Sequence, residues 1–118
     1  MLMWPLTVRV FLSTEPADMR RSFEGLAAIV REAMGADPLS GHLFVFRNRR
    51  ADGVKILYWD RSGLALWYKR IEKGLFRFPT SDGASQEVEA SDLALLLEGI
   101  DLAVARRRER FEPVRHLS

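Results

Sequence analysis

Short apolar runs alternate with polar and charged clusters through the middle of the chain, from Gly41 to Pro79. The runs are rich in β-branched, leucine and aromatic residues, which favour a pleated, half-buried surface. Asp-Gly, Ser-Gly and Lys-Gly pairs separate the runs, and such pairs favour tight reversals of the chain. The pattern predicts an antiparallel meander of three or four strands at His42–Phe46, Val54–Trp59, Leu64–Tyr68 and Leu75–Phe78.

A strand and a helix are predicted before this meander. Every second residue of the segment 7–12 is aliphatic, and this period of two predicts a strand. Asp18 is a candidate N-cap for a helix that runs to about Met34 and is stopped by Gly35. Its apolar residues recur at steps of four and three, so they share the face that we expect to pack on the sheet. These residues are Met19, Phe23, Leu26, Val30 and Ala33.

A further strand and helix are predicted after Pro79. Residues 80–85 form a polar loop, and Gln86–Glu89 is a candidate short edge strand. Ser91 is a candidate N-cap for a helix whose apolar residues follow at i, i+3, i+4 and i+7. These apolar residues are Leu93, Leu96, Leu97 and Ile100.

The expected fold class is α+β. It consists of an antiparallel β-meander of four to five strands, packed by an N-terminal amphipathic helix and a short C-terminal helix. A chain of 118 residues suits one domain, which we expect to span residues 1–104. Residues 105–118 then form a basic C-terminal tail, which is either a nucleic-acid arm or a solubilising end.

Charge is distributed unevenly along the chain. Residues 42–79 contain nine basic and three acidic residues, whereas the rest contains nine basic and thirteen acidic residues. A basic sheet surface attracts polyanions through its local field, although the net charge is only +2. The alternative is that charges at turns and edges keep a small sheet soluble. The candidate nucleic-acid-binding residues are Arg47, Arg49, Arg50, Lys55, Arg61, Lys69, Arg70, Lys73 and Arg77.

The sequence offers little for catalysis, cofactors or metals. The absence of cysteine excludes disulfides and thiolate metal sites and fits a reducing cytoplasm. His42 and His116 lack evident partners, and the Asp residues stand at caps and turns where Asp is common. There is no Gly-rich phosphate loop and no run of about twenty apolar residues. We therefore expect a cytoplasmic protein that is not an enzyme, needs no cofactor or metal and has no membrane partner.

Several ordered blocks of the sequence resemble one family. The chain is similar to the TnpB (Orf2-type) accessory proteins of the IS66 group of bacterial insertion sequences, from about residue 7 to 101. Taken together, several long blocks in the same order are far more specific than any single motif. The blocks are Asp18–Leu26, Asp37–Arg50, Lys55–Asp60, Gly63-Leu64, Tyr68–Gly74, Phe76 and Leu96–Asp101.

The resemblance implies a role in transposition rather than a reaction. Strand transfer in such elements is assigned to a separate, larger transposase, and the family offers no catalytic residues to carry over. The leading hypothesis is that the basic sheet and turns grip phosphates at the ends of the element's DNA and help the transposase assemble there. The alternative is an adapter that binds the transposase without contacting DNA. Trp59, Trp67 and Tyr68 are candidates for base stacking or, as aromatic residues in strands usually are, for the core.

Overall fold

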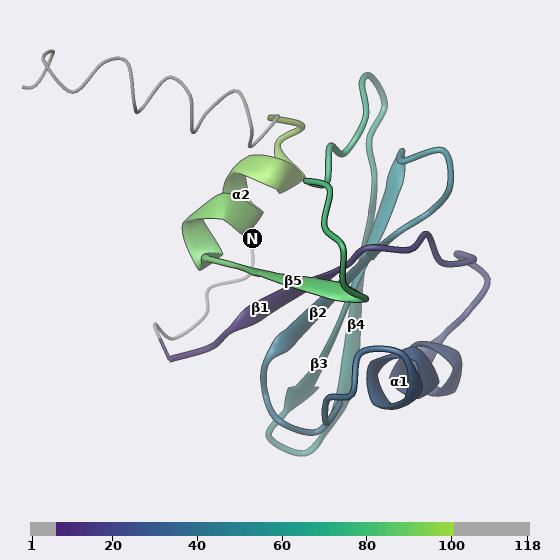
Figure 1. Ribbon diagram of the computed structural model, residues 1–118. Coiled ribbons are helices and arrows are strands. Elements are labelled where there is room, and N and C mark those ends of the chain that lie inside the picture. Colours follow the sequence, from purple (N-terminus) through teal and green to yellow (C-terminus); the bar gives the residue numbers. More distant parts are fainter. Residues whose placement is uncertain (1–6, 101–118) are drawn as a thin grey trace, which may run out of the picture.

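The fold is a five-stranded sheet with one helix on each face. The computed structural model describes residues 7–100 of the chain. The strands lie in the order β4-β3-β2-β1-β5 across the sheet, and the two helices lie on opposite sides of it (Figure 1). The elements in chain order are β1 (Val10–Ser13), α1 (Phe23–Glu32), β2 (Leu43–Arg47), β3 (Gly53–Asp60), β4 (Gly63–Arg70), β5 (Ser85–Val88) and α2 (Ala90–Leu97).

The sheet is mixed, so the predicted purely antiparallel meander is wrong for β1. Strands β2, β3 and β4 do form an antiparallel meander. Strand β1, however, pairs in parallel with β2, with Val10 opposite Leu43, and antiparallel with β5. The connection from β1 to β2 contains α1 and is long enough to return the chain to the starting end of the sheet, as parallel pairing requires. This crossover places β1 inside the sheet.

Successive side chains of the strands point to opposite faces of the sheet and pack into two separate hydrophobic clusters. On the α2 side, Val10, Val45 and Ile56 pack with Leu93 and Leu96. On the α1 side lie the strand residues Phe44, Phe46 and Leu57, which pack with Leu26, Ala27 and Val30 of the helix. Both faces of the central strands are therefore buried, and runs such as LFVF are apolar at consecutive positions rather than at every second one.

The observed helices are shorter than the predicted ones. Helix α1 begins at Phe23, because the chain turns at Asp18, whose backbone C=O accepts from the Arg21 N–H. Met19 consequently lies before the helix, yet its side chain still packs against the α1-side cluster. Helix α2 is preceded by Glu89, which forms a reciprocal capping box with Asp92, so Glu89 rather than the predicted Ser91 is the N-cap.

The segment after β4 is irregular where a strand is predicted at Leu75–Phe78. The Phe76 side chain is nevertheless fully buried, and its backbone N–H donates to the Ala51 carbonyl. This contact folds the segment back over the β2–β3 turn.

The predicted edge strand is confirmed within one residue as β5. The predicted tail, residues 105–118, lies outside the described residues.

Candidate nucleic-acid interface

One asparagine builds the turn that carries two of the candidate arginines. The Asn48 side-chain oxygen accepts from the N–H groups of Asp52 and Gly53, both at 3.0 Å. Its amide nitrogen donates to the Asp52 carboxylate at 2.6 Å. Ala51 has a positive φ of 62°, and its N–H donates to the Asn48 carbonyl. These bonds, made by Asn48 and Asp52, fix the turn on which the exposed Arg49 and Arg50 side chains stand.

The sheet topology gathers further cations beside this turn. Arg47 ends β2, and Arg70 is opposite Gly53 at the end of β4. The Ile71 N–H donates to the Asp52 carbonyl, which brings the turn containing Lys73 to the same place. Arg77 stands between Phe76, which is bound to Ala51, and Phe78, whose ring lies 5.8 Å from the Arg47 guanidinium carbon. We call this surface the basic end: Arg47, Arg49, Arg50, Arg70, Lys73 and Arg77.

Three of the nine candidate residues lie elsewhere or are already engaged. Arg61 is in the β3–β4 turn, at the opposite end of the eight-residue strand β3, which corresponds to roughly 23 Å. Lys69 extends to the α2 side, where its ammonium donates to the Leu97 carbonyl at the end of α2. Lys55 is only 8% exposed, and its ammonium donates to the carbonyls of Met19 and Arg21 at 2.7 and 2.9 Å. The basic end therefore contains only six of the nine candidate residues predicted from the sequence.

The basic end is positive although two carboxylates, Asp52 and Glu72, lie among its six cations. The pKa of Asp52 lies below its ordinary value, chiefly because Asn48 donates a hydrogen bond to it, with help from the charges of Arg50 and Arg70. Burial opposes this shift. The Arg50 guanidinium is 4.0 Å from the Asp52 carboxylate and remains 87% exposed. Six cations against the carboxylates of Asp52 and Glu72 leave a net positive charge that is available to an anion.

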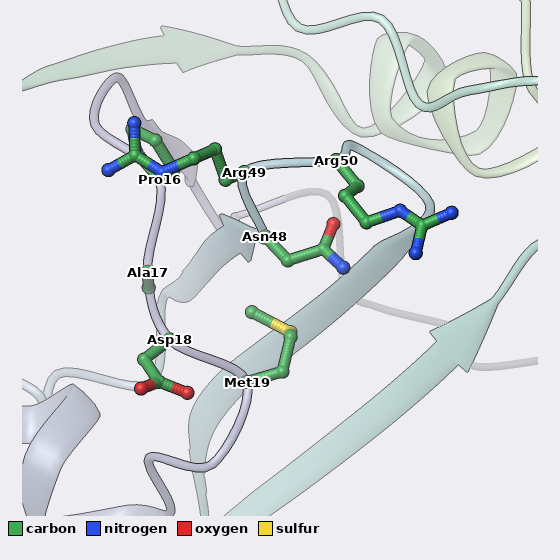
Figure 2. A pocket seen from close by; sticks show the side chains of 7 residues that line it. All are labelled: Pro16, Ala17, Asp18, Met19, Asn48, Arg49 and Arg50. Carbon is green, nitrogen blue, oxygen red and sulfur yellow. The ribbon is translucent and has the colours of Figure 1, made fainter.

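A shallow pocket of about 450 Å³ adjoins the basic end. Pro16, Ala17, Asp18 and Met19 line one side and the turn residues Asn48, Arg49 and Arg50 line the other. In Figure 2 the Arg49 side chain extends toward Pro16, whereas Arg50 points away on the other side of the turn. The Ala17 N–H holds the two segments together by donating to the Arg47 carbonyl at 2.8 Å. The pocket thus has apolar residues and the Asp18 carboxylate on one side, and Asn48 with two arginines on the other.

Asp18 at this pocket is paired within its own segment. Its carboxylate accepts from the Arg20 guanidinium, at 2.7 Å to the nearest nitrogen, and from the Arg20 backbone N–H. The side-chain bond, followed by the backbone bond, lowers the Asp18 pKa to about 2. The predicted helix cap at Asp18 is therefore wrong: its carboxylate stabilises this local turn, and α1 begins at Phe23.

This pairing predicts a specific titration. In wild-type protein, we expect the Asp18 carboxyl carbon to titrate by NMR near pH 2, and in Arg20→Ala to move back toward the ordinary value of 3.8. Because the folded pKa is lowered, the stabilisation is present above pH 4 and is lost as pH falls toward 2. Arg21→Ala is the control, since its guanidinium makes only a minor contribution. An unchanged Asp18 titration in Arg20→Ala would contradict the pairing.

The described part of the chain contains no cluster of metal-ligating side chains. Within residues 7–100, no three His, Cys, Asp or Glu side chains come close enough to hold a metal ion. The same residues contain no helix with the length and apolar character needed to cross a bilayer. The exposed cations of the basic end are suited to binding an anion.

Comparison with known proteins assigns the family. The family model described as IS66 Orf2 like protein matches residues 8–107. The chain belongs to the IS66 Orf2-like family. The predicted resemblance is therefore confirmed, and the protein is one of those associated with IS66 insertion sequences.

Two proteins of Sinorhizobium fredii illustrate the IS66 Orf2-like relatives. The "Uncharacterized protein y4jC" is 36% identical over 108 residues, which cover 92% of each chain. The "Uncharacterized protein y4hO" is 39% identical over 94 residues, which cover 80% of this chain and 82% of the relative. No solved structure matches the chain.

The structure joins two of the sequence blocks that carry the resemblance to this family. Asp18 and Met19 come from the first block, and Asn48, Arg49 and Arg50 end the second. All five residues line the same pocket. No role for Asn48 is predicted from the sequence, because its bonds reach the N–H groups four and five residues on rather than the residue two positions on that an Asx-turn uses.

Proposed function

We propose that this IS66 Orf2-like protein binds DNA through the basic end and so assists a separate transposase in transposition of its element. The observation that carries the proposal is the convergence of six cations from three parts of the chain at one end of the sheet. Family membership supplies the context of transposition. The proposed role is binding without catalysis, and as a DNA-binding protein it would act in the cytoplasm.

Phosphate binding fits the character of the basic end better than base readout does. Arg49, Arg50 and Arg70 are exposed, and guanidinium groups bind phosphate oxygens through paired N–H donors. The rigid turn built by Asn48 fixes where the two turn arginines start, which lowers the entropy cost of engagement. These contacts carry no sequence information by themselves, so preference for the element's ends would come from the assembled complex.

The proposal predicts strongly salt-dependent DNA binding. A labelled duplex carrying the element's end and a scrambled duplex should both bind in fluorescence anisotropy at low salt. If about five phosphates are contacted, affinity should fall by roughly two to three orders of magnitude between about 50 and 200 mM salt, because each contact releases a counterion. A failure to bind either duplex at low salt would overturn the proposal.

A second candidate function is an adapter that docks on the transposase. The specific observation is that two large apolar side chains, Tyr68 and Leu75, are 47% and 41% exposed near the basic end. Aromatic residues and arginine together are typical of the centres of protein interfaces. Co-purification with the transposase that survives at about 500 mM salt, combined with no DNA binding, would favour the adapter, since an apolar interface is little screened.

A further inference from the structure

The two edge strands of the sheet differ in how they are protected from pairing. Edge strand β5 has four residues, and its Glu87 carboxylate forms an ion pair at 2.6 Å with Arg9, the residue before the neighbouring strand β1. Edge strand β4 has eight residues, and its centre, Leu64–Tyr68, is apolar and free of proline. Natural sheets usually shorten, charge or cover an exposed edge. Within the described residues, β5 follows this rule, whereas β4 carries charge only at its last two residues, Lys69 and Arg70.

The outer backbone groups of β4 can be assigned from its register with β3. The Ile71 N–H donates to the Asp52 carbonyl, and this pair continues the register in which Gly53 is opposite Arg70. Hydrogen-bonded pairs alternate along an antiparallel ladder, so the odd-numbered residues of β4 bond to β3. The N–H and C=O groups of Leu64, Leu66, Tyr68 and Arg70 therefore point away from the sheet.

The side chains along this edge are partly exposed apolar groups. Leu64, Leu66 and Trp67 are half-buried, and Tyr68 is 47% exposed. The segment before α1 is linked to this edge through Lys55, whose ammonium is 5.2 Å from the centre of the Tyr68 ring and also donates to the Arg21 carbonyl. Phe23, two residues after Arg21, adds another apolar side chain that is 41% exposed. An additional strand beside β4 would cover this apolar edge while satisfying its outer backbone groups.

We propose that β4 pairs with β4 of a second copy of this chain, antiparallel and with Leu66 opposite Leu66. A parallel pair would set Lys69 and Arg70 beside the same cations of the partner, which costs free energy, whereas the antiparallel pair separates them. In this register Arg70 faces Ser62 and Trp67 faces the small Ala65, so within β4 no like charges are directly opposed and the largest side chain faces a small one. A shift by two residues in one direction would place Lys69 against Arg61.

The consequence is a symmetric dimer with one sheet continuing through both copies. The pairing is isologous, because each copy contributes the same edge. Each copy keeps its own basic end, and the two basic ends point in opposite directions, since β4 ends at the basic end and its partner runs the other way. This inference stands independently of DNA binding.

Cysteine cross-linking tests the pairing directly, because the chain has no cysteine of its own. Opposed residues with outward N–H groups have Cα atoms about 5.5 Å apart, within the range that a disulfide spans. We expect Leu66→Cys to form a disulfide-linked dimer in most of the protein on mild oxidation. Leu39→Cys, at a leucine that is more exposed than Leu66 and lies outside the sheet, is the control and should remain largely monomeric under the same conditions.

Mass measurement of the wild type completes the test. Light scattering on the full chain at about 100 µM should give twice the 13.5 kDa chain mass. A wild-type monomer at this concentration would overturn the proposal. The proposal would also be overturned if the wild type is a dimer but Leu66→Cys cross-links no better than Leu39→Cys. In that case another surface would hold the two copies together.

Discussion

Reversing both turn arginines, in Arg49→Glu/Arg50→Glu, is expected to weaken DNA binding by about a hundredfold or more at low salt. Each guanidinium is proposed to make a charge-assisted bond to phosphate, worth about 1.5–3 kcal/mol, and the new carboxylates would repel the same phosphates. The turn should stay folded, because Asn48 and not the arginines fixes its backbone. Anisotropy with the element-end duplex measures the loss.

A second double charge reversal tests whether DNA binds at the basic end or is attracted by the net charge of the protein alone. Arg31→Glu/Arg61→Glu changes the net charge by the same amount, but Arg31 is in the last turn of α1 and Arg61 is in the β3–β4 turn. Both lie away from the basic end, so affinity should change by no more than several-fold. If the two double variants lose affinity equally, long-range attraction alone explains binding and the basic end is not the site.

The Lys55→Met substitution is expected to lower the free energy of unfolding by about 2 kcal/mol. Methionine keeps the length and packing of the buried stem, but the carbonyls of Met19 and Arg21 lose their charged donor. Together with the Ala17 bond to Arg47, Lys55 ties the segment before α1 to the sheet. Chemical denaturation measures the effect.

The control for Lys55→Met is the same substitution at Lys69. Lys69 makes one bond, to the Leu97 carbonyl, and is less buried, so Lys69→Met should cost less than half as much. A DNA measurement adds a second readout, since a lysine that contacts phosphate reduces the salt slope by about one when it is removed. If Lys55→Met changes the salt slope but leaves stability unaltered, Lys55 contacts DNA instead of supporting the fold.

Most secondary structure in this chain is readable from local sequence, but the place of β1 is not. The apolar runs and their glycine turns locate β2, β3 and β4, because hairpin neighbours interact over short separations. Strand β1 pairs with β2 and β5, which are far away in the sequence, and its parallel pairing depends on the path of the crossover. Alternation in residues 7–12 shows that a strand exists there but not which strands flank it.

The candidate interface was predictable where its residues lie in a turn and less so where they lie in strands. Arg49 and Arg50 occupy a turn between two apolar runs, so exposure follows from the pattern. Lys55 is within a run, and the length of its stem lets a buried position place the charge at backbone carbonyls. The order of the strands, rather than any motif, brings Arg70 to the β2–β3 turn and leaves Arg61 at the other end.

The most direct test of DNA contact at the basic end is amide chemical-shift mapping of ¹⁵N-labelled protein titrated with the element-end duplex at low salt. The proposal predicts the largest shift changes in residues 48–53 and 70–77, with little change in the β3–β4 turn around Arg61. Shift changes centred on that far turn or on α2, with residues 48–53 unaffected, would contradict binding at the basic end.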